Sequence, residues 1–204
     1  MSAMVKLMSS FLILGSILVA SATSPLPAFA ADAAQASATS ELTTPMQKLD
    51  TLFAELKRER DQDKAREISN RIRVEWQESG SATVNLLMQW ASKAVETNQQ
   101  ATALDIFDQV ITLSPRYVEG WNQRATLHYQ MGNYRKSMSD INQVLAIEPR
   151  HFGALAGMAA ILTSSGQDEL ALRAWEQFLD IYPADRKAQE QLGELEEKLA
   201  GNRT

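Results

Sequence analysis

The sequence predicts an all-α fold, a right-handed helix-turn-helix solenoid, from three features that recur along its C-terminal two thirds. Pro115, Pro149 and Pro183 lie 34 residues apart, each closing a stretch that holds two helices. Apolar residues between them follow helical spacing. Small residues recur at one position of each first helix and one of each second helix: Ala91, Ala125, Ala159 and Ala103, Ser137, Ala171. Small side chains let two backbones approach closely, and a sustained period of this length is typical of helical solenoids.

The register defines three units, residues 84–117, 118–151 and 152–185. Each unit contains a break between its two helices, and the proline at its end prevents the second helix from continuing. Gly132 and Gly166 provide the break in the second and third units. Asn98 stands where the first unit would carry glycine, and asparagine tolerates the left-handed conformation that such a turn requires.

Each unit resembles a tetratricopeptide repeat (TPR). The middle unit carries the family's pattern most completely, in Trp121, Ala125, His128, Gly132, Ser137, Ile141, Val144 and Pro149. The resemblance implies two helices per unit and an inner wall, built by the first helices, that binds a segment of another protein. The chain as a whole is similar to the small exported TPR proteins of Gram-negative bacteria.

Both flanks of the repeats are predicted to be helical. Residues 45–83 read as a divergent TPR-like helix pair, with Phe53 and Trp76 among its apolar residues and Ala65 at the small position. Residues 186–204 read as a capping helix and tail whose apolar stripe is Ala188, Leu192, Leu195 and Leu199. Terminal repeats of solenoids need such polar-backed caps for solubility.

The N-terminus predicts export. Residues 1–30 combine a single Lys6, an apolar run and the small residues Ala28 and Ala30, which is the pattern of a signal peptide cleaved after Ala30. Its apolar core is too short to span a membrane. Residues 31–44 are rich in Ala, Ser and Thr and read as a flexible tether. We therefore expect a periplasmic or secreted protein without stable membrane insertion after cleavage.

Composition excludes several classes of function. The formal net charge of −5 makes nucleic acid a poor partner, and the absence of cysteine excludes disulfides and thiolate metal sites. His128 falls at a packing position and His151 in a loop, so neither joins a catalytic constellation. Core packing is the expected role for most of the four tryptophans. We expect no enzyme activity, no cofactor and no metal.

The resemblance carries fourteen candidate partner-binding residues onto the first helices. Below, "inner wall" refers to this set: Asn85, Met88, Gln89, Ser92, Glu119, Asn122, Gln123, Thr126, Tyr129, Gln130, Gly153, Ala156, Gly157 and Ala160. Its Gly/Ala end has room for a bulky ligand or, equally, for the capping helix itself. Chaperone-binding TPR proteins hold a C-terminal carboxylate with Lys, Asn and Arg on this wall. Here those positions carry Met88, Ser92, Gln123, Gly153 and Gly157.

The expected function is a periplasmic adaptor or scaffold that binds a peptide or helix of an envelope protein in the concave groove. Two alternatives remain open at this point. One is a structural envelope protein that self-associates into a homo-oligomer through its first helix pair or its third unit. The other is an assembly factor of the cytochrome-maturation type, because periplasmic TPR domains hold apocytochromes during haem attachment.

Overall fold

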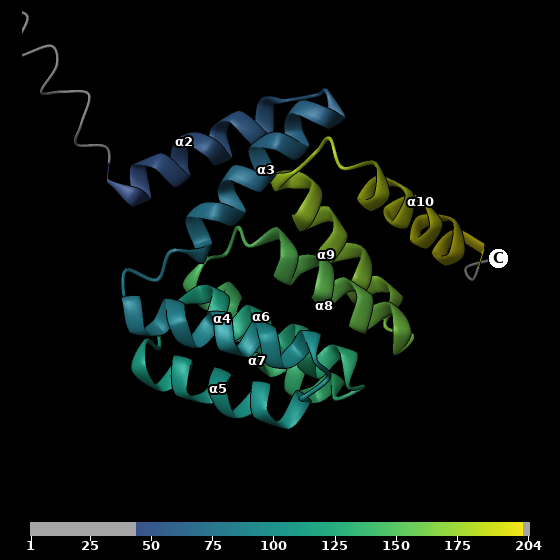
Figure 1. The fold of residues 1–204 in the computed structure, drawn as a ribbon. Helices are drawn as coiled ribbons and strands as arrows, with labels where there is room; N and C mark the ends of the chain where they lie inside the picture. Colours follow the sequence, from purple (N-terminus) through teal and green to yellow (C-terminus); the bar gives the residue numbers. More distant parts are fainter. Residues whose placement is uncertain (1–43, 202–204) are drawn as a thin grey trace, which may run out of the picture. The chain divides into compact units, whose positions relative to one another are not determined.

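A computed structural model of the chain describes residues 44–201. The predicted signal peptide and almost all of the predicted tether lie outside the described residues. Between residues 44 and 201 the chain is all-helical and contains no strand (Figure 1). The helices are α2 (Pro45–Arg58), α3 (Gln62–Gln77), α4 (Ala82–Glu96), α5 (Gln100–Leu113), α6 (Val118–Gln130), α7 (Tyr134–Ile147), α8 (Phe152–Ser164), α9 (Asp168–Ile181) and α10 (Arg186–Gly201).

The three predicted units form the pairs α4–α5, α6–α7 and α8–α9, which confirms the predicted solenoid. The two columns of small residues are buried to between 0% and 2% exposure, because the backbones of paired helices meet there. The turn inside each unit relies on a positive φ, of 75° at Gly132 and 72° at Gly166. Asn98 takes the same conformation in the first unit, with φ of 58°, as its position in the repeat predicts.

The divergent helix pair α2–α3 begins with strong local signals. Thr44 caps α2 by accepting from the backbone N–H of Gln47, whose side chain accepts from the Thr44 N–H in return. Asp61 caps α3 by accepting from two backbone N–H groups. Both caps satisfy backbone donors that have no partner within the helix, and the Thr44 cap is reciprocal. The pair buries an apolar face that includes Leu56 and Ile72.

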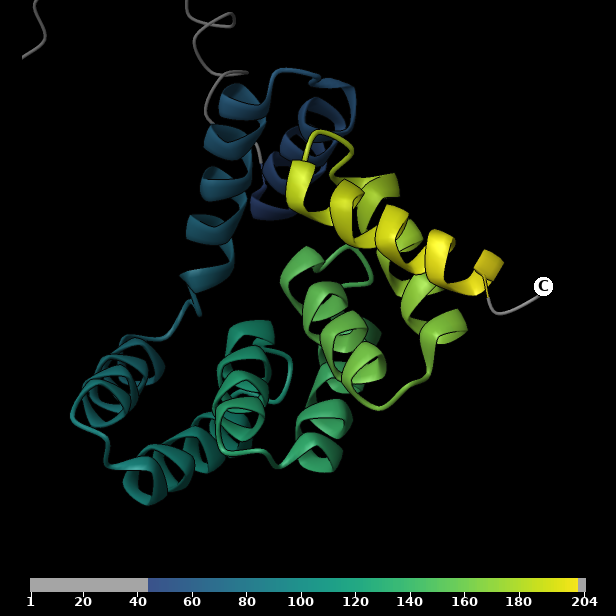
Figure 2. The ribbon, with the colours of Figure 1, turned by 90° about the vertical axis from the view of Figure 1, so that its right-hand side faces the viewer.

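This pair does not share its core with the unit that follows it in sequence. Its buried residues join one apolar cluster with α6 to α10, whereas those of α4 and α5 form two separate clusters. Figure 2 shows α2 and α3 beside the C-terminal helices and apart from α4 and α5. Trp76 stacks on His151 with 4.1 Å between ring centroids, and Arg150 lies over the Phe53 ring at 4.1 Å. The N-terminal helix pair therefore packs against the second and third units.

Polar contacts reinforce this docking. The Tyr117 hydroxyl donates to the backbone oxygen of Gln77 over 2.8 Å, and burial raises the pKa of that phenol, so it remains a donor. Arg150 pairs with Asp50 at 2.7 Å, which links the second unit to α2. Lys57 pairs with Asp180 at 3.1 Å, but both side chains are exposed and the pair contributes little.

Helix α10 covers the end of the solenoid by packing on α9. Ala188 and Leu195 are buried, while Leu192 and Leu199 are partly buried. The predicted stripe therefore faces the third unit. No helix between residues 44 and 201 is both long and apolar enough to cross a bilayer.

Candidate functional site

The inner wall lines three hollows that follow the first helices α4, α6 and α8. Every one of its fourteen residues borders at least one of them. The unit-one hollow, of about 520 Å³, is bordered by α4, the start of α6 and the end of α3. The middle hollow, of about 230 Å³, lies between α4 and α6. The unit-three hollow, of about 360 Å³, lies between α6, α8 and α10.

The unit-one and middle hollows offer uncommitted polar groups. Gln89, Ser92 and Gln130 are exposed, and their side chains make no hydrogen bond within residues 44–201. Asn85 is already engaged, because its carboxamide oxygen accepts from the Ser79 hydroxyl and backbone N–H. Free amides and hydroxyls on an exposed wall are suited to pairing with the backbone of a bound segment.

The unit-three hollow has nearly bare walls. Gly153, Ala156, Gly157 and Ala160 border it along α8, and Tyr129 borders it from α6 with its side chain 39% exposed. A Cβ at Gly157 would lie 3.3 Å from Ile141 Cδ1, so glycine there lets α8 pack closely against α7. Lys187 and Gln191 of α10 border the same hollow. The capping helix therefore forms part of the wall of the unit-three hollow and does not fill it.

Glu119 differs from the rest of the inner wall because it is buried, at 6% exposure. Its carboxylate accepts from His151 Nε2 at 3.1 Å, from Asn122 Nδ2 at 3.1 Å and from Gln123 Nε2 at 3.0 Å. Burial alone would raise the pKa of Glu119. The hydrogen bond and electrostatic interaction with His151, together with the hydrogen bonds from Asn122 and Gln123, outweigh burial and lower the pKa from the ordinary value of 4.5. The carboxylate thus orders two amides of the inner wall and remains ionised.

His151 completes this cluster from the start of α8. Its Nδ1 accepts from the backbone N–H of Ala154 at 3.0 Å, so the neutral ring carries its proton on Nε2 and donates it to Glu119. Trp76 stacks on one face of the ring. The repeat pattern predicts that His151 lies in the loop after Pro149, and in the structure it lies there, directly before α8. Its burial, at 2% exposure, could not be predicted because Trp76 comes from a distant helix.

His128 is buried in α6, as its packing position predicts. Its Nδ1 is buried and has no hydrogen-bond partner among residues 44–201. Burial lowers the pKa of His128 from the ordinary value of 6.5; Asp140 opposes this effect, and Lys136 and Arg124 add to it. The third unit has Leu162 at the same repeat position.

Replacing His128 by leucine is expected to stabilise the protein by about 1 kcal/mol, because it removes a buried ring nitrogen that has no hydrogen-bond partner among residues 44–201. It should also change the pH dependence. The unfolded histidine takes up a proton below pH 6.5 more readily than the folded one, so the parent loses stability as the pH falls through that range. Urea unfolding at pH 7 and pH 5 should show a smaller loss for the variant. An H128L protein less stable than the parent at pH 7 would contradict this.

The tryptophans divide by environment. Trp76 and Trp175 are buried, Trp121 is partly buried with its Nε1 donating to the Pro115 oxygen, and Trp90 is 54% exposed on α4. Core packing therefore holds for most of them, as predicted. Across residues 44–201 no group of three or more His, Asp or Glu side chains is placed to hold a metal ion.

Comparison with known proteins identifies the family. A TPR repeat-containing protein of Rhizobium etli is 64% identical over 186 residues, which is 89% of this chain and 90% of that protein. The chain belongs to the tetratricopeptide repeat family. The small glutamine-rich tetratricopeptide repeat-containing protein 2 of Mycosarcoma maydis is 22% identical over 111 residues, 54% of this chain and 32% of that protein. No family model matches the chain.

Solved TPR structures share the fold. The first TPR domain of Spaghetti, bound to an HSP90 peptide, superposes with a TM-score of 0.54 at 19% identity, over 57% of this chain and 93% of that one. The Sgt2 TPR domain of Aspergillus fumigatus gives 0.54 at 16% identity, over 61% and 84%. MamA gives 0.54 at 14% identity, over 57% and 68%. These likenesses confirm the TPR solenoid.

Proposed function

We propose that this TPR protein is an exported adaptor that binds a segment of an envelope protein along its inner wall and catalyses no reaction. The observation that carries the proposal is the continuity of the wall. Fourteen positions chosen by repeat register border three hollows on consecutive first helices. Amides and hydroxyls gather at one end, and Tyr129 with small residues at the other.

Related domains support this kind of ligand. The Spaghetti domain was solved with an HSP90 peptide, and the TPR2B domain of yeast Sti1 was solved in a complex with an Hsp70. The carboxylate-binding residues of chaperone adaptors are missing here, since Met88, Gln123 and Gly153 occupy three of those positions. An internal peptide or a helix therefore fits this wall better than an acidic C-terminus.

Export rests on the N-terminal pattern. The run from Lys6 to Ala30 predicts a signal peptide, and with it a periplasmic or secreted location. The proposed partner accordingly belongs to the cell envelope. A crosslinking pull-down from the periplasmic fraction, analysed by mass spectrometry, would identify it and supply the ligand for binding measurements.

Ala156→Arg should weaken binding of that ligand at least tenfold. The long side chain would project from α8 into the unit-three hollow, which Ala156 borders without filling. Tenfold corresponds to about 1.4 kcal/mol of binding free energy. Fluorescence anisotropy with the identified segment provides the measurement.

Ala146→Arg is the matched control, because Ala146 is exposed on α7 and borders none of the three hollows. It should leave affinity unchanged, and the melting temperatures of both variants should stay close to that of the parent. A folded A156R protein with full affinity would place the binding surface elsewhere.

A further inference from the structure

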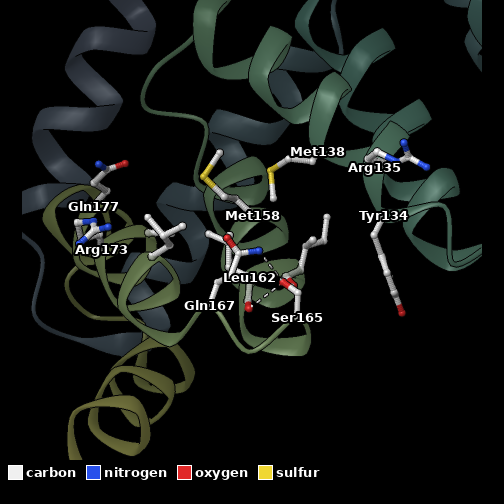
Figure 3. A pocket seen from close by; sticks show the side chains of 12 residues that line it. Tyr134, Arg135, Met138, Met158, Leu162, Ser165, Gln167, Arg173 and Gln177 are labelled. Carbon is white, nitrogen blue, oxygen red and sulfur yellow. Dashed lines mark hydrogen bonds between the residues drawn. The ribbon is translucent and has the colours of Figure 1, made fainter. Parts of the chain in front are cut away.

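An apolar groove lies between the second helices of units two and three, on residues outside the inner wall. Helices α7 and α9 form its sides and α8 forms its floor, and it encloses about 550 Å³ (Figure 3). Its apolar lining consists of Met138, Met158, Ile161, Leu162, Leu170 and Ala174. We call this the outer groove. It shares no residue with the three inner hollows.

At the equivalent place between units one and two, an ion-pair network covers the surface. Arg124 reaches from α6 to Asp140 of α7 at 2.7 Å and also pairs with Asp108 of α5, while its guanidinium lies 5.1 Å from the Trp121 ring centroid. One repeat later, Met158 stands at the position of Arg124 and Ala174 at that of Asp140. The third unit therefore lacks both partners of the ion pair, and its surface is open and apolar at this place.

Two large apolar side chains remain exposed on opposite sides of the outer groove. Tyr134 on α7 is 44% exposed and Leu170 on α9 is 40% exposed. A ligand confined to the hollow would leave both in water, whereas a helix lying along the groove would cover them. Flexible methionines suit such a surface, because they adapt to the side chains they meet.

The charges around the outer groove are of one sign. Arg135 and Arg173 border it, and Figure 3 shows them at opposite ends of the drawn side chains with Met138 and Met158 between. Neither arginine forms an ion pair within residues 44–201, and no Asp or Glu borders the groove. Arginine pairs well with carboxylates, so acidic residues at both ends of a bound helix would be complementary.

We propose that the outer groove is a second docking site, and that it binds an amphipathic helix of a partner protein with a short apolar row and acidic residues at both ends. This site is independent of the inner wall. The two sites together would let one chain hold two segments at once, which suits an adaptor.

The probe is a synthetic peptide of about 18 residues, long enough to populate a helix in water. It carries leucines at helical spacing in its middle and glutamates at both ends. The comparison peptide has lysines in place of the glutamates. Labelled methionine methyl groups of the full chain report binding by NMR, because Met138 and Met158 border the outer groove and Met88 borders the unit-one hollow.

The acidic peptide should shift the Met138 and Met158 methyl signals and leave that of Met88 unchanged, and the basic peptide should bind at least tenfold more weakly. The double variant Met158→Arg/Ala174→Asp, which copies the Arg124–Asp140 pair, should reduce affinity for the acidic peptide at least tenfold. Arg135→Gln/Arg173→Gln should remove the preference for acidic ends. Ala156→Arg, in the unit-three hollow, should have no effect.

Three results would overturn the proposal. One is equal binding of the two peptides, and another is the absence of shifts at Met138 and Met158. The third is binding of sodium dodecanoate at these methionines without binding of the acidic peptide, which would identify a small-ligand site. Because Ala156→Arg tests the inner wall and the double variant tests the outer groove, failure of one site leaves the other measurable.

Discussion

Replacing Trp76 by alanine is expected to lower the free energy of unfolding by about 3–5 kcal/mol. Trp76 is 5% exposed and lies against three aromatic rings, those of His151 at 4.1 Å, Phe152 at 5.0 Å and Phe53 at 5.9 Å between centroids. It joins α3 to the last repeats, so its loss leaves a cavity where two segments distant in sequence meet. Urea unfolding of the variant provides the measurement.

Trp90→Ala is the matched control. Trp90 is 54% exposed, so its removal should change stability by only about 0.5 kcal/mol or less. Amide hydrogen exchange adds a local measurement: in W76A, protection should fall first in α2 and α3. If both tryptophan variants were equally stable, the helix pair would not be held by Trp76.

Removal of the Glu119 carboxylate is expected to cost about 3 kcal/mol. In Glu119→Ala, the buried Nε2–H of His151 loses its acceptor, and the amides of Asn122 and Gln123 lose theirs. Gln123→Ala is the control, because it removes one donor from an exposed residue and leaves the His151 contact intact. Thermal unfolding should show a clear loss for E119A and a small one for the control.

The same carboxylate sets a pH dependence with a defined sign. The pKa of Glu119 is lowered in the folded protein, so below its ordinary value of 4.5 the unfolded chain binds a proton more readily. The stability that Glu119 contributes is present above that value and is lost as the pH falls through the lowered pKa. Unfolding experiments from pH 6 to pH 3 should therefore give a flatter profile for E119A. Parallel profiles for parent and variant would contradict this role.

The repeat region could be predicted from sequence because its recurring small residues and turn residues are required where neighbouring helices pack closely. Ala125 and Ser137 had to be small where α6 meets α7, and Asn98 had to permit a left-handed turn. The inner wall followed from the same register, since residues at equivalent repeat positions face the same way. Whether those residues bind a partner stays a prediction.

The docking of α2 and α3 could not be predicted in this way. Their amphipathic faces indicated helices that bury one side, but no pattern encodes which distant surface that side meets. Glu119 shows the consequence. Its repeat position indicates an exposed wall residue, but it is buried against His151, on which Trp76 stacks. The outer groove was missed for a related reason: only comparison of Met158 with Arg124 in the folded chain reveals the lost ion pair.

The most direct test of binding by the inner wall is photocrosslinking in cells. A benzophenone amino acid would replace Tyr129, which borders the unit-three hollow, or Ala146, which is exposed outside it. The chain would be recovered from the periplasmic fraction after irradiation. Our account predicts a discrete adduct with an envelope protein from position 129 and none from position 146. An adduct from position 146 alone, or from neither position in a folded and exported chain, would contradict it.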